Sequence, residues 1–192
     1  MLRGRKSCLR EAIEADRRKI YEWLAHSELT PSMMGPPVFA DHPIPTWDEF
    51  CADYRAHYFN DSKPRKGRCF IIVADQTEVG VLCYNAVRSD NVTDVDIWLR
   101  SEADCGKGLG SDALGTLTDY LNKEFGVTKI AVSPSARNPR AIAAYRKAGF
   151  HPVSPEKYYE FVKTEEMEYE DNVVLVKEYT HDTREPPASQ EQ

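Results

Sequence analysis

Apolar and polar positions change their pattern along the chain, and the changes predict separate elements. The segments CFIIVAD and EVGVLCYNAV, over 69–75 and 78–87, are nearly continuous apolar runs, which is typical of adjacent strands buried on both faces. The next segment, VTDVDIWL over 92–99, alternates with a period of two, which predicts another strand. Its two faces are expected to be Val95, Ile97 and Leu99 on one side, and Asp94, Asp96 and Trp98 on the other.

Helical periodicity or helix-end signals appear in four further segments. These segments are 16–26, 46–59, 111–125 and 138–150. Asp16 is the expected N-cap of the first helix, and Thr46 with Glu49 forms a predicted capping box for the second. Gly126 follows the third helix, where a left-handed residue commonly ends a helix.

Further strands are predicted on both sides of this central region. They lie at 7–13, at 127–134, and near 157–164 and 172–179. Between the first two helices, residues 27–47 hold five prolines and one glycine, a composition that predicts no regular structure. Because this segment also carries Met33, Met34, Phe39 and Trp47, we expect a packed lid.

The order of predicted elements indicates one α/β domain. We expect a mixed central sheet of about six to seven strands flanked by helices, spanning residues 1–181. The last residues, 182–192, are polar and contain prolines, and we expect them to be disordered.

Composition and charge narrow the class of protein. A hydrophobic share of 41% and a charged share of 29% are ordinary for a soluble globular protein, and no apolar run is long enough to span a membrane. A net charge of −6 argues against nucleic acid and favours a cationic partner. The five cysteines show no C-x-x-C spacing, so we expect reduced thiols, a cytoplasmic location and no metal site.

Three alternating glycines, Gly106, Gly108 and Gly110, stand between the strand at 92–99 and the helix at 111–125. Main-chain N–H groups in such a loop can approach a phosphate closely at the start of a helix. The P-loop pattern does not occur here, and the dinucleotide fingerprint fails in its third spacing.

The glycine stretch CGKGLG, over 105–110, resembles the pyrophosphate loop of the GNAT acetyltransferases, and NPRAIAAYRKAGF, over 138–150, resembles their second signature. Within that family the chain is most similar to the aminoglycoside 6′-acetyltransferases. Two departures stand out: Cys105 occupies the usual Arg or Gln position, and Ser133 stands where those enzymes carry a substrate-binding Asp.

The resemblance implies an acetyl-CoA site at the junction of the central strand, the glycine loop and the central helix. The residues expected to hold this cosubstrate are Leu99, whose N–H would polarise the carbonyl in a bulged strand, Cys105, Gly106, Lys107, Gly108, Leu109, Gly110, Ser111 and Asn138. Asn138 is equally suited to be a helix N-cap.

The resemblance also assigns the chemistry. Asp96, ten residues before Gly106, is the expected base for the acceptor amine, and Tyr145 is the expected acid for the departing thiolate. Asp94, Trp98 and Tyr84 are expected to bind the acceptor.

Three functions remain open at this stage. The first is an N-acetyltransferase for a small cationic amine, such as an aminoglycoside, a polyamine or an amino sugar. The second acetylates a protein N-terminus or lysine, and the third is a module that binds coenzyme A without catalysis. We expect a monomer or homodimer that binds neither nucleic acid nor membrane.

Overall fold

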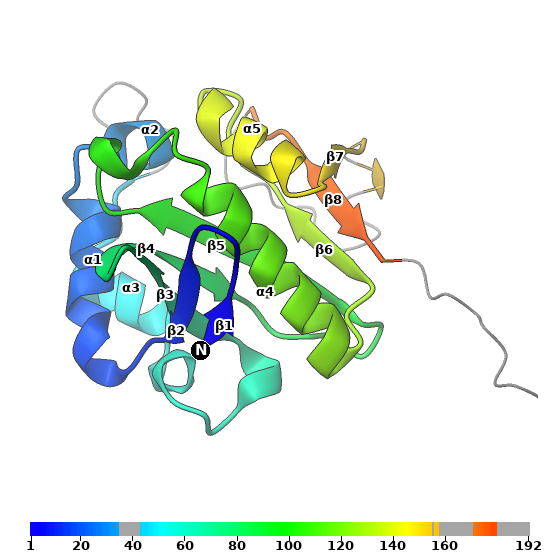
Figure 1. Cartoon of the computed structure of the whole chain (residues 1–192), viewed down its shortest axis with the longest axis horizontal. Helices are drawn as coiled ribbons and strands as arrows, with labels where there is room; N and C mark the ends of the chain where they lie inside the picture. The colour runs from blue at the N-terminus through cyan, green and yellow to red at the C-terminus, as the bar shows by residue number, and fades with distance from the viewer. Residues whose placement is uncertain (35–42, 155, 158–170, 180–192) are drawn as a thin grey trace, which may run out of the picture.

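The computed structural model describes residues 1–34, 43–154, 156–157 and 171–179, which form a central sheet with helices on both faces (Figure 1). The strands are β1 (Leu2–Arg3), β2 (Cys8–Glu11), β3 (Arg68–Ala74), β4 (Thr77–Tyr84), β5 (Val92–Leu99), β6 (Lys129–Val132), β7 (His151–Pro152) and β8 (Leu175–Glu178). The helices are α1 (Arg17–Ala25), α2 (Thr30–Met34), α3 (Trp47–Asp53), α4 (Leu109–Phe125) and α5 (Pro139–Lys147). Short 3₁₀ turns cover Glu14–Asp16, Ala56–Phe59, Pro64–Lys66 and Glu102–Asp104.

Strand order in the sheet is β1-β2-β3-β4-β5-β6-β8-β7. The pairing is antiparallel except between β5 and β6, which run parallel and are connected through α4. The β5–β6 ladder is short, since it joins only 92–94 to 129–131. Although β5 continues to Leu99, its pairing with β6 ends at Asp94, and the two strands are no longer paired beyond that point.

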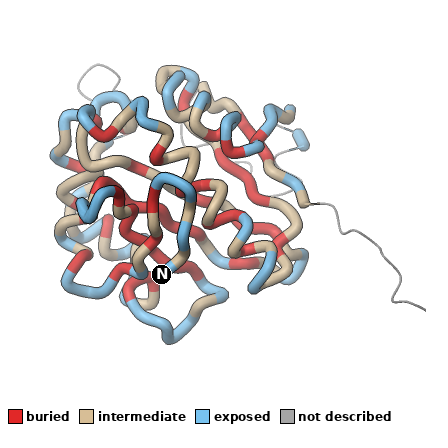
Figure 2. Tube along the Cα trace, viewed as in Figure 1, coloured by how far each residue is buried: buried red, intermediate tan, exposed pale blue. Residues whose placement is uncertain are grey.

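Each face of the sheet has its own apolar core, visible in Figure 2 as buried stretches along the strands and along the helices packed on them. On one face α4 covers the sheet with the fully buried side chains Leu114, Leu117 and Leu121. On the other face α1 and α3 contribute Ile20, Tyr21 and Phe50. This arrangement follows from the apolar stripes of the helices, which must be covered by the sheet.

Most predicted elements are confirmed, with differences at their edges. Among the described residues the sheet has eight strands and not six to seven, because β1 and β7 are two-residue strands that leave too short a pattern to detect. The predicted second helix ends at Asp53, and the turn at Ala56–Phe59 is a separate 3₁₀ segment. The capping box is confirmed, since Thr46 Oγ1 accepts from Glu49 N and Glu49 Oε2 accepts from Thr46 N.

One local prediction is wrong and another holds only in part. Residues 27–47 contain the helix α2, because Pro31 lies in its first turn, where a missing N–H costs nothing. Asp16 is the N-cap residue of α1, as predicted, but its side chain makes no capping bond; its carboxylate instead accepts from Arg10, Lys19 and the N–H of Ile13. Residues 158–164 of the predicted strand at 157–164, the tail at 182–192 and Phe39 lie outside the described residues, and Lys157 is helical.

The expectation of five reduced thiols is also wrong. Cys69 and Cys83 form a disulfide between β3 and β4, because the sheet register places them directly opposite each other with a Cα–Cα distance of 4.2 Å. Cys8, Cys51 and Cys105 are free. The disulfide therefore removes one of the reasons for expecting a cytoplasmic location. None of the described helices combines the length and apolarity that crossing a bilayer requires.

Candidate active site

A cavity of about 740 Å³ lies where β5 and β6 stop pairing. Its lining comes from 94–98 of β5, from 132–135 at the end of β6, and from α3 and α5. Met33, Met34 and two prolines of the 27–47 segment also line it, so this part of the expected lid does pack at the site. Volumes of this size suit a small organic ligand.

The cavity is acidic. Asp94 and Asp96 enter it from β5, and Glu49 and Asp53 enter it from α3. No lysine, arginine or histidine occurs among the described residues that line it. Such a lining attracts cations and disfavours anionic acceptors.

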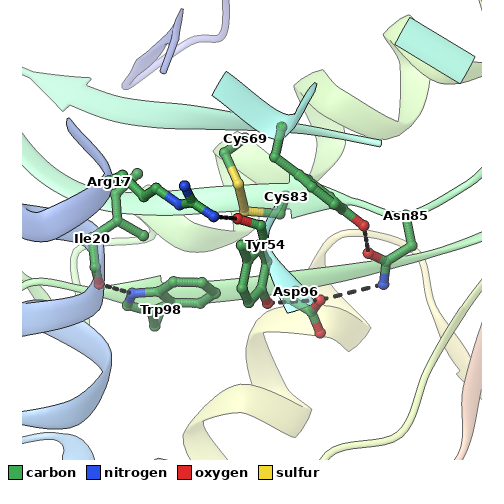
Figure 3. The surroundings of a disulfide bond; sticks show 9 residues. Arg17, Ile20, Tyr54, Cys69, Cys83, Asn85, Asp96 and Trp98 are labelled. Carbon is green, nitrogen blue, oxygen red and sulfur yellow. Dashed lines mark hydrogen bonds between the residues drawn. A yellow bond between two sulfur atoms is a disulfide. The ribbon is translucent and has the colours of Figure 1, made fainter. Parts of the chain in front are cut away.

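Asp94 and Asp96 share a face of β5 because of the alternation predicted from the sequence, which places Val95 in the core under α4. Two donors approach the Oδ2 atom of Asp96, as Figure 3 shows. Tyr54 donates its hydroxyl proton at 3.2 Å, and the side-chain amide of Asn85 donates at 3.5 Å. Hydrogen bonds of this kind favour the ionised carboxylate.

Asn85 follows the last residue of β4 and connects the two aspartates. Its Nδ2 also donates to Oδ2 of Asp94, and its Oδ1 accepts the hydroxyl of Tyr58 at 2.6 Å. Burial raises the pKa of Tyr58 to about 12, and the negative charges of Asp96 and Asp94 add to the effect. Tyr58 therefore remains a protonated donor at neutral pH.

Further contacts with α1 hold the side chains of Tyr54 and Trp98 in place (Figure 3). Trp98 packs edge-on against Tyr54 with ring centroids 5.8 Å apart, and its indole N–H donates to Ile20 O at 3.2 Å. Arg17 donates to Tyr54 O at 2.6 Å and to Cys51 O at 2.9 Å. These bonds fasten the end of α3 to α1, which positions the Tyr54 side chain over Asp96.

The second signature forms α5, which borders the cavity. Tyr145 lines it and is 6% exposed, with its ring packed edge-on against Phe150 at 5.5 Å. Asn138 also lines the cavity, and its Oδ1 accepts from Ala141 N at 3.1 Å, so it is the N-cap of α5. Ser133, at the expected Asp position, lines the cavity as well.

The glycine loop has the conformation that an anion site requires. Gly106 and Gly108 adopt positive φ angles of 72° and 81°, and a Cβ on Gly106 would meet no atom within 4 Å. Gly108 is the N-cap of α4 and supplies no side-chain cap, so the N–H groups of Leu109, Gly110 and Ser111 have no partner within the helix. The loop therefore fits a pyrophosphate group.

The β1–β2 hairpin supports this loop. The carboxylate of Asp112, in the first turn of α4, accepts the backbone N–H groups of Arg5, Lys6 and Ser7 at 2.9–3.0 Å. The ammonium group of Lys6 donates to Lys107 O at 3.0 Å. Lys6, which was not predicted from the sequence, therefore adds a positive charge beside the loop.

The direction of the N–H groups along β5 bears on Leu99, the residue expected to donate to the acetyl carbonyl. Asn85 N donates to Asp94 O at 3.0 Å, so the ladder groups of Asp94 face β4. The alternation of an antiparallel ladder then turns the N–H groups of Ile97 and Leu99 toward β6. The expected bulge is absent from the β4–β5 ladder, whose register runs without a shift from Gly80–Leu99 to Tyr84–Val95.

Nine predicted site residues are not part of the cavity lining: Tyr84, Leu99 and the seven residues of 105–111. Tyr84 is fully buried in the core under α4, where its hydroxyl donates to Pro64 O at 2.7 Å, so the structure does not bring it to the acceptor site. The Lys107 side chain is exposed. Cys105 is half-buried, and burial raises the pKa of its thiol while Arg140 acts in the opposite direction.

Tyr54, Tyr58 and Asn85 also line the cavity, although none of them was predicted from the sequence. Asn85 left one signal, since it is a polar residue at the end of a buried apolar run. The two tyrosines left no signal that separates them from core aromatics.

Comparison with known proteins places these features in a family. Residues 6–151 match the acetyltransferase (GNAT) domain. An aminoglycoside N(6′)-acetyltransferase type 1 of Klebsiella pneumoniae is 42% identical over 59 residues, which are 31% of this chain and 29% of that enzyme.

Solved structures agree with the fold. AAC(6′)-Ib in complex with paromomycin and acetyl-CoA superposes with a TM-score of 0.66 at 22% identity, covering 90% of this chain and 93% of that one. The ribosomal L7/L12 α-N-protein acetyltransferase RimL, in complex with coenzyme A, gives 0.67 at 16% identity, covering 91% and 95%. At these identities the likeness establishes the fold alone.

Proposed function

Because the chain belongs to the GNAT acetyltransferase family, we propose that it is an acetyl-CoA-dependent N-acetyltransferase whose acceptor is a small cationic amine. The acidic cavity at the split between β5 and β6 is the observation that carries this proposal. The match to the Klebsiella enzyme covers less than a third of either chain, so the acceptor is argued from the cavity and not from that enzyme.

The glycine loop and the start of α4 hold acetyl-CoA, which supplies the acetyl thioester. Backbone N–H groups from Gly106 to Ser111 bind the pyrophosphate, and the positive end of the 17-residue helix α4 adds to the attraction. The N–H of Leu99, or that of Ile97 on the same edge of β5, polarises the acetyl carbonyl. A donor of this kind contributes about 3–4 kcal/mol in other enzymes.

Asp96 receives the acceptor's ammonium group and takes its proton, either directly or through a water molecule. An amine attacks a thioester only when it is neutral, so this transfer must precede bond formation. Asp94 lies on the same face of β5 and adds a second negative charge. Together the two carboxylates bind the cation before one of them acts as a base.

Tyr145 hydrogen-bonds or protonates the departing thiolate. Its place on α5 puts the phenol in the same cavity as Asp96, across the gap that separates β5 from β6. The proton lost by the amine and the proton given to sulfur therefore pass through different residues, which lets the acid and the base act on opposite sides of the acetyl group.

The test is the release of coenzyme A thiol from acetyl-CoA with a panel of acceptors. The panel holds aminoglycosides, polyamines, amino sugars and peptides with free N-termini. We expect turnover with one class of small polycationic amine, and a fall in kcat/KM of about 100-fold or more in Asp96→Asn. Turnover with peptides alone would instead support a protein acetyltransferase.

A matched variant distinguishes the loss of the base from the loss of one negative charge anywhere on the protein. Asp75→Asn removes a carboxylate in the exposed β3–β4 turn, where asparagine tolerates the positive φ of 47°. We expect wild-type turnover in this control. No turnover with any acceptor, while acetyl-CoA still binds, would contradict the proposed activity and favour the non-catalytic module.

A further inference from the structure

Asn85 lies between two like charges that the strand geometry forces together. Asp94 and Asp96 stand on one face of β5, about 7 Å apart at Cα. Each carboxylate therefore disfavours ionisation of the other. Among the described residues that line the cavity around them, the titratable ones are Tyr54, Tyr58, Tyr145, Glu49 and Asp53.

The Asn85 amide supplies the two donors that this pair needs. Its Nδ2 donates to Oδ2 of Asp94 and to Oδ2 of Asp96, so one neutral group bridges both carboxylates. An –NH₂ group has two protons and no acceptor lone pair in use, which matches two acidic neighbours. A positively charged bridge would instead have reduced the attraction of the cavity for a cationic acceptor.

The orientation of the amide is determined from both ends. Rotating the amide by 180° would turn Oδ1 toward two carboxylates, an arrangement with no donor. At the other end, the Tyr58 hydroxyl donates to Oδ1 at 2.6 Å, and the buried phenol stays protonated because its pKa is raised to about 12. Arg55 lowers the pKa of Tyr58, but its effect is smaller than that of burial and than those of Asp96 and Asp94.

The Asn85 backbone is equally constrained. Its N–H donates to Asp94 O at 3.0 Å, and its carbonyl accepts the Thr93 hydroxyl at 2.9 Å. The first bond continues the backbone pairing of β4 with β5 by one residue past Tyr84, and the second ties the Asn85 carbonyl to a β5 side chain. The side chain therefore enters the cavity from a rigid strand end and not from a loop.

We propose that Asn85 is a positioning residue that holds Asp94 and Asp96 together in their ionised forms as one cation-binding pair, and that Tyr58 orients its amide. This inference rests on the proposed acetyl transfer for its role, although the placement of the pair can be measured without turnover. It extends the site beyond Asp96 and Tyr145, since neither Asn85 nor Tyr58 needs to touch the reacting atoms.

The first measurement is a carboxyl ¹³C NMR titration of Asp94 and Asp96 in the full chain. In Asn85→Leu, which keeps the volume but removes both donors, we expect their titration to move upward by about one pH unit. Tyr58→Phe should move it in the same direction by a smaller amount, because the amide remains but is free to rotate. Asn122→Leu is the matched control: Asn122 donates to Val127 O far from the cavity, so its loss should reduce stability without moving the titration.

The second measurement is the pH profile of kcat/KM with the best acceptor found for the wild type. In Asn85→Leu the acidic limb of this profile should shift to higher pH together with the titration of the two carboxylates. In Asn122→Leu it should stay at the wild-type pH. The proposal would be overturned if the titration of Asp94 and Asp96 is unchanged in folded Asn85→Leu and Tyr58→Phe. It would also be overturned if that titration moves in Asn85→Leu while the acidic limb of the kcat/KM profile does not. If Asn85→Leu does not fold, Tyr58→Phe decides the question alone.

The two proposals fail in different ways. Wild-type protein that turns over no acceptor contradicts the acetyltransferase, and the catalytic role of Asn85 falls with it. A normal turnover panel combined with unmoved titrations contradicts only the role of Asn85.

Discussion

At the scale of single residues, substitution can separate the packing role of a side chain from its chemical role. Tyr145 is such a case, because its ring packs against Phe150 and the residue also lines the cavity. In Tyr145→Phe the ring contact is kept, so we expect the free energy of unfolding to change by no more than about 1 kcal/mol. We expect kcat to fall about 100-fold with unchanged acetyl-CoA binding, measured by steady-state kinetics and calorimetry.

Tyr120→Phe is the matched control for this substitution. Tyr120 packs edge-on against Phe70 and Phe125, and it does not line the cavity. Its kcat should equal that of the wild type. A Tyr145→Phe enzyme that also keeps full kcat would show that the phenol serves packing alone.

At the scale of elements, α4 offers a matched pair of glycines at its two ends. Gly106 and Gly126 have φ angles of 72° and 68°, and a Cβ on either would meet nothing within 4 Å. Gly106→Ala and Gly126→Ala should therefore each lower the free energy of unfolding by about 1 kcal/mol, the cost of a left-handed alanine.

The two variants should differ in coenzyme A binding. Gly106 precedes the helix, where the backbone approaches the pyrophosphate, whereas Gly126 follows the opposite end. We expect the Kd for coenzyme A to rise about tenfold in Gly106→Ala only, measured by calorimetry. Equal Kd values in both variants would place the pyrophosphate elsewhere.

At the scale of the whole molecule, a net charge of −6 and an acidic cavity act together on charged ligands. Salt shortens the reach of this field, so we expect KM for the cationic acceptor to rise severalfold between about 50 mM and about 500 mM salt. KM for the anionic acetyl-CoA should not rise in parallel, which serves as the internal control. A salt-independent KM for the acceptor would mean that the carboxylates of the cavity do not attract it.

Local signals in the sequence were enough to predict the main elements and two parts of the site, the aspartate pair of β5 and the glycine loop. The alternation of 92–99 placed Asp94 and Asp96 on one face, and the capping box placed the start of α3 at Thr46. The glycines of 106–110 marked the start of α4. Each of these features depends on residues only a few positions apart, where side-chain period and allowed φ angles act directly.

Tyr84 is a residue whose position such local signals could not predict. It lies in a continuous apolar run, which carries no alternation and hence does not say which face each residue takes. The register with β5 decides it: Tyr84 pairs with Val95 and shares its core face, whereas Asn85 follows on the face of Asp94. The same strand thus supplies one core residue and one site residue in succession.

By itself, then, the sequence determined the family, the order of the main elements and the two signatures, the second of which borders the cavity. The tertiary structure alone decided which distant residues meet: Cys69 with Cys83, Tyr54 with Asp96, and Tyr58 with Asn85 between the two aspartates. The physical reason is that these contacts depend on strand register and on how α3 packs against the sheet. Both are set by burial over the whole core and leave no period in the chain.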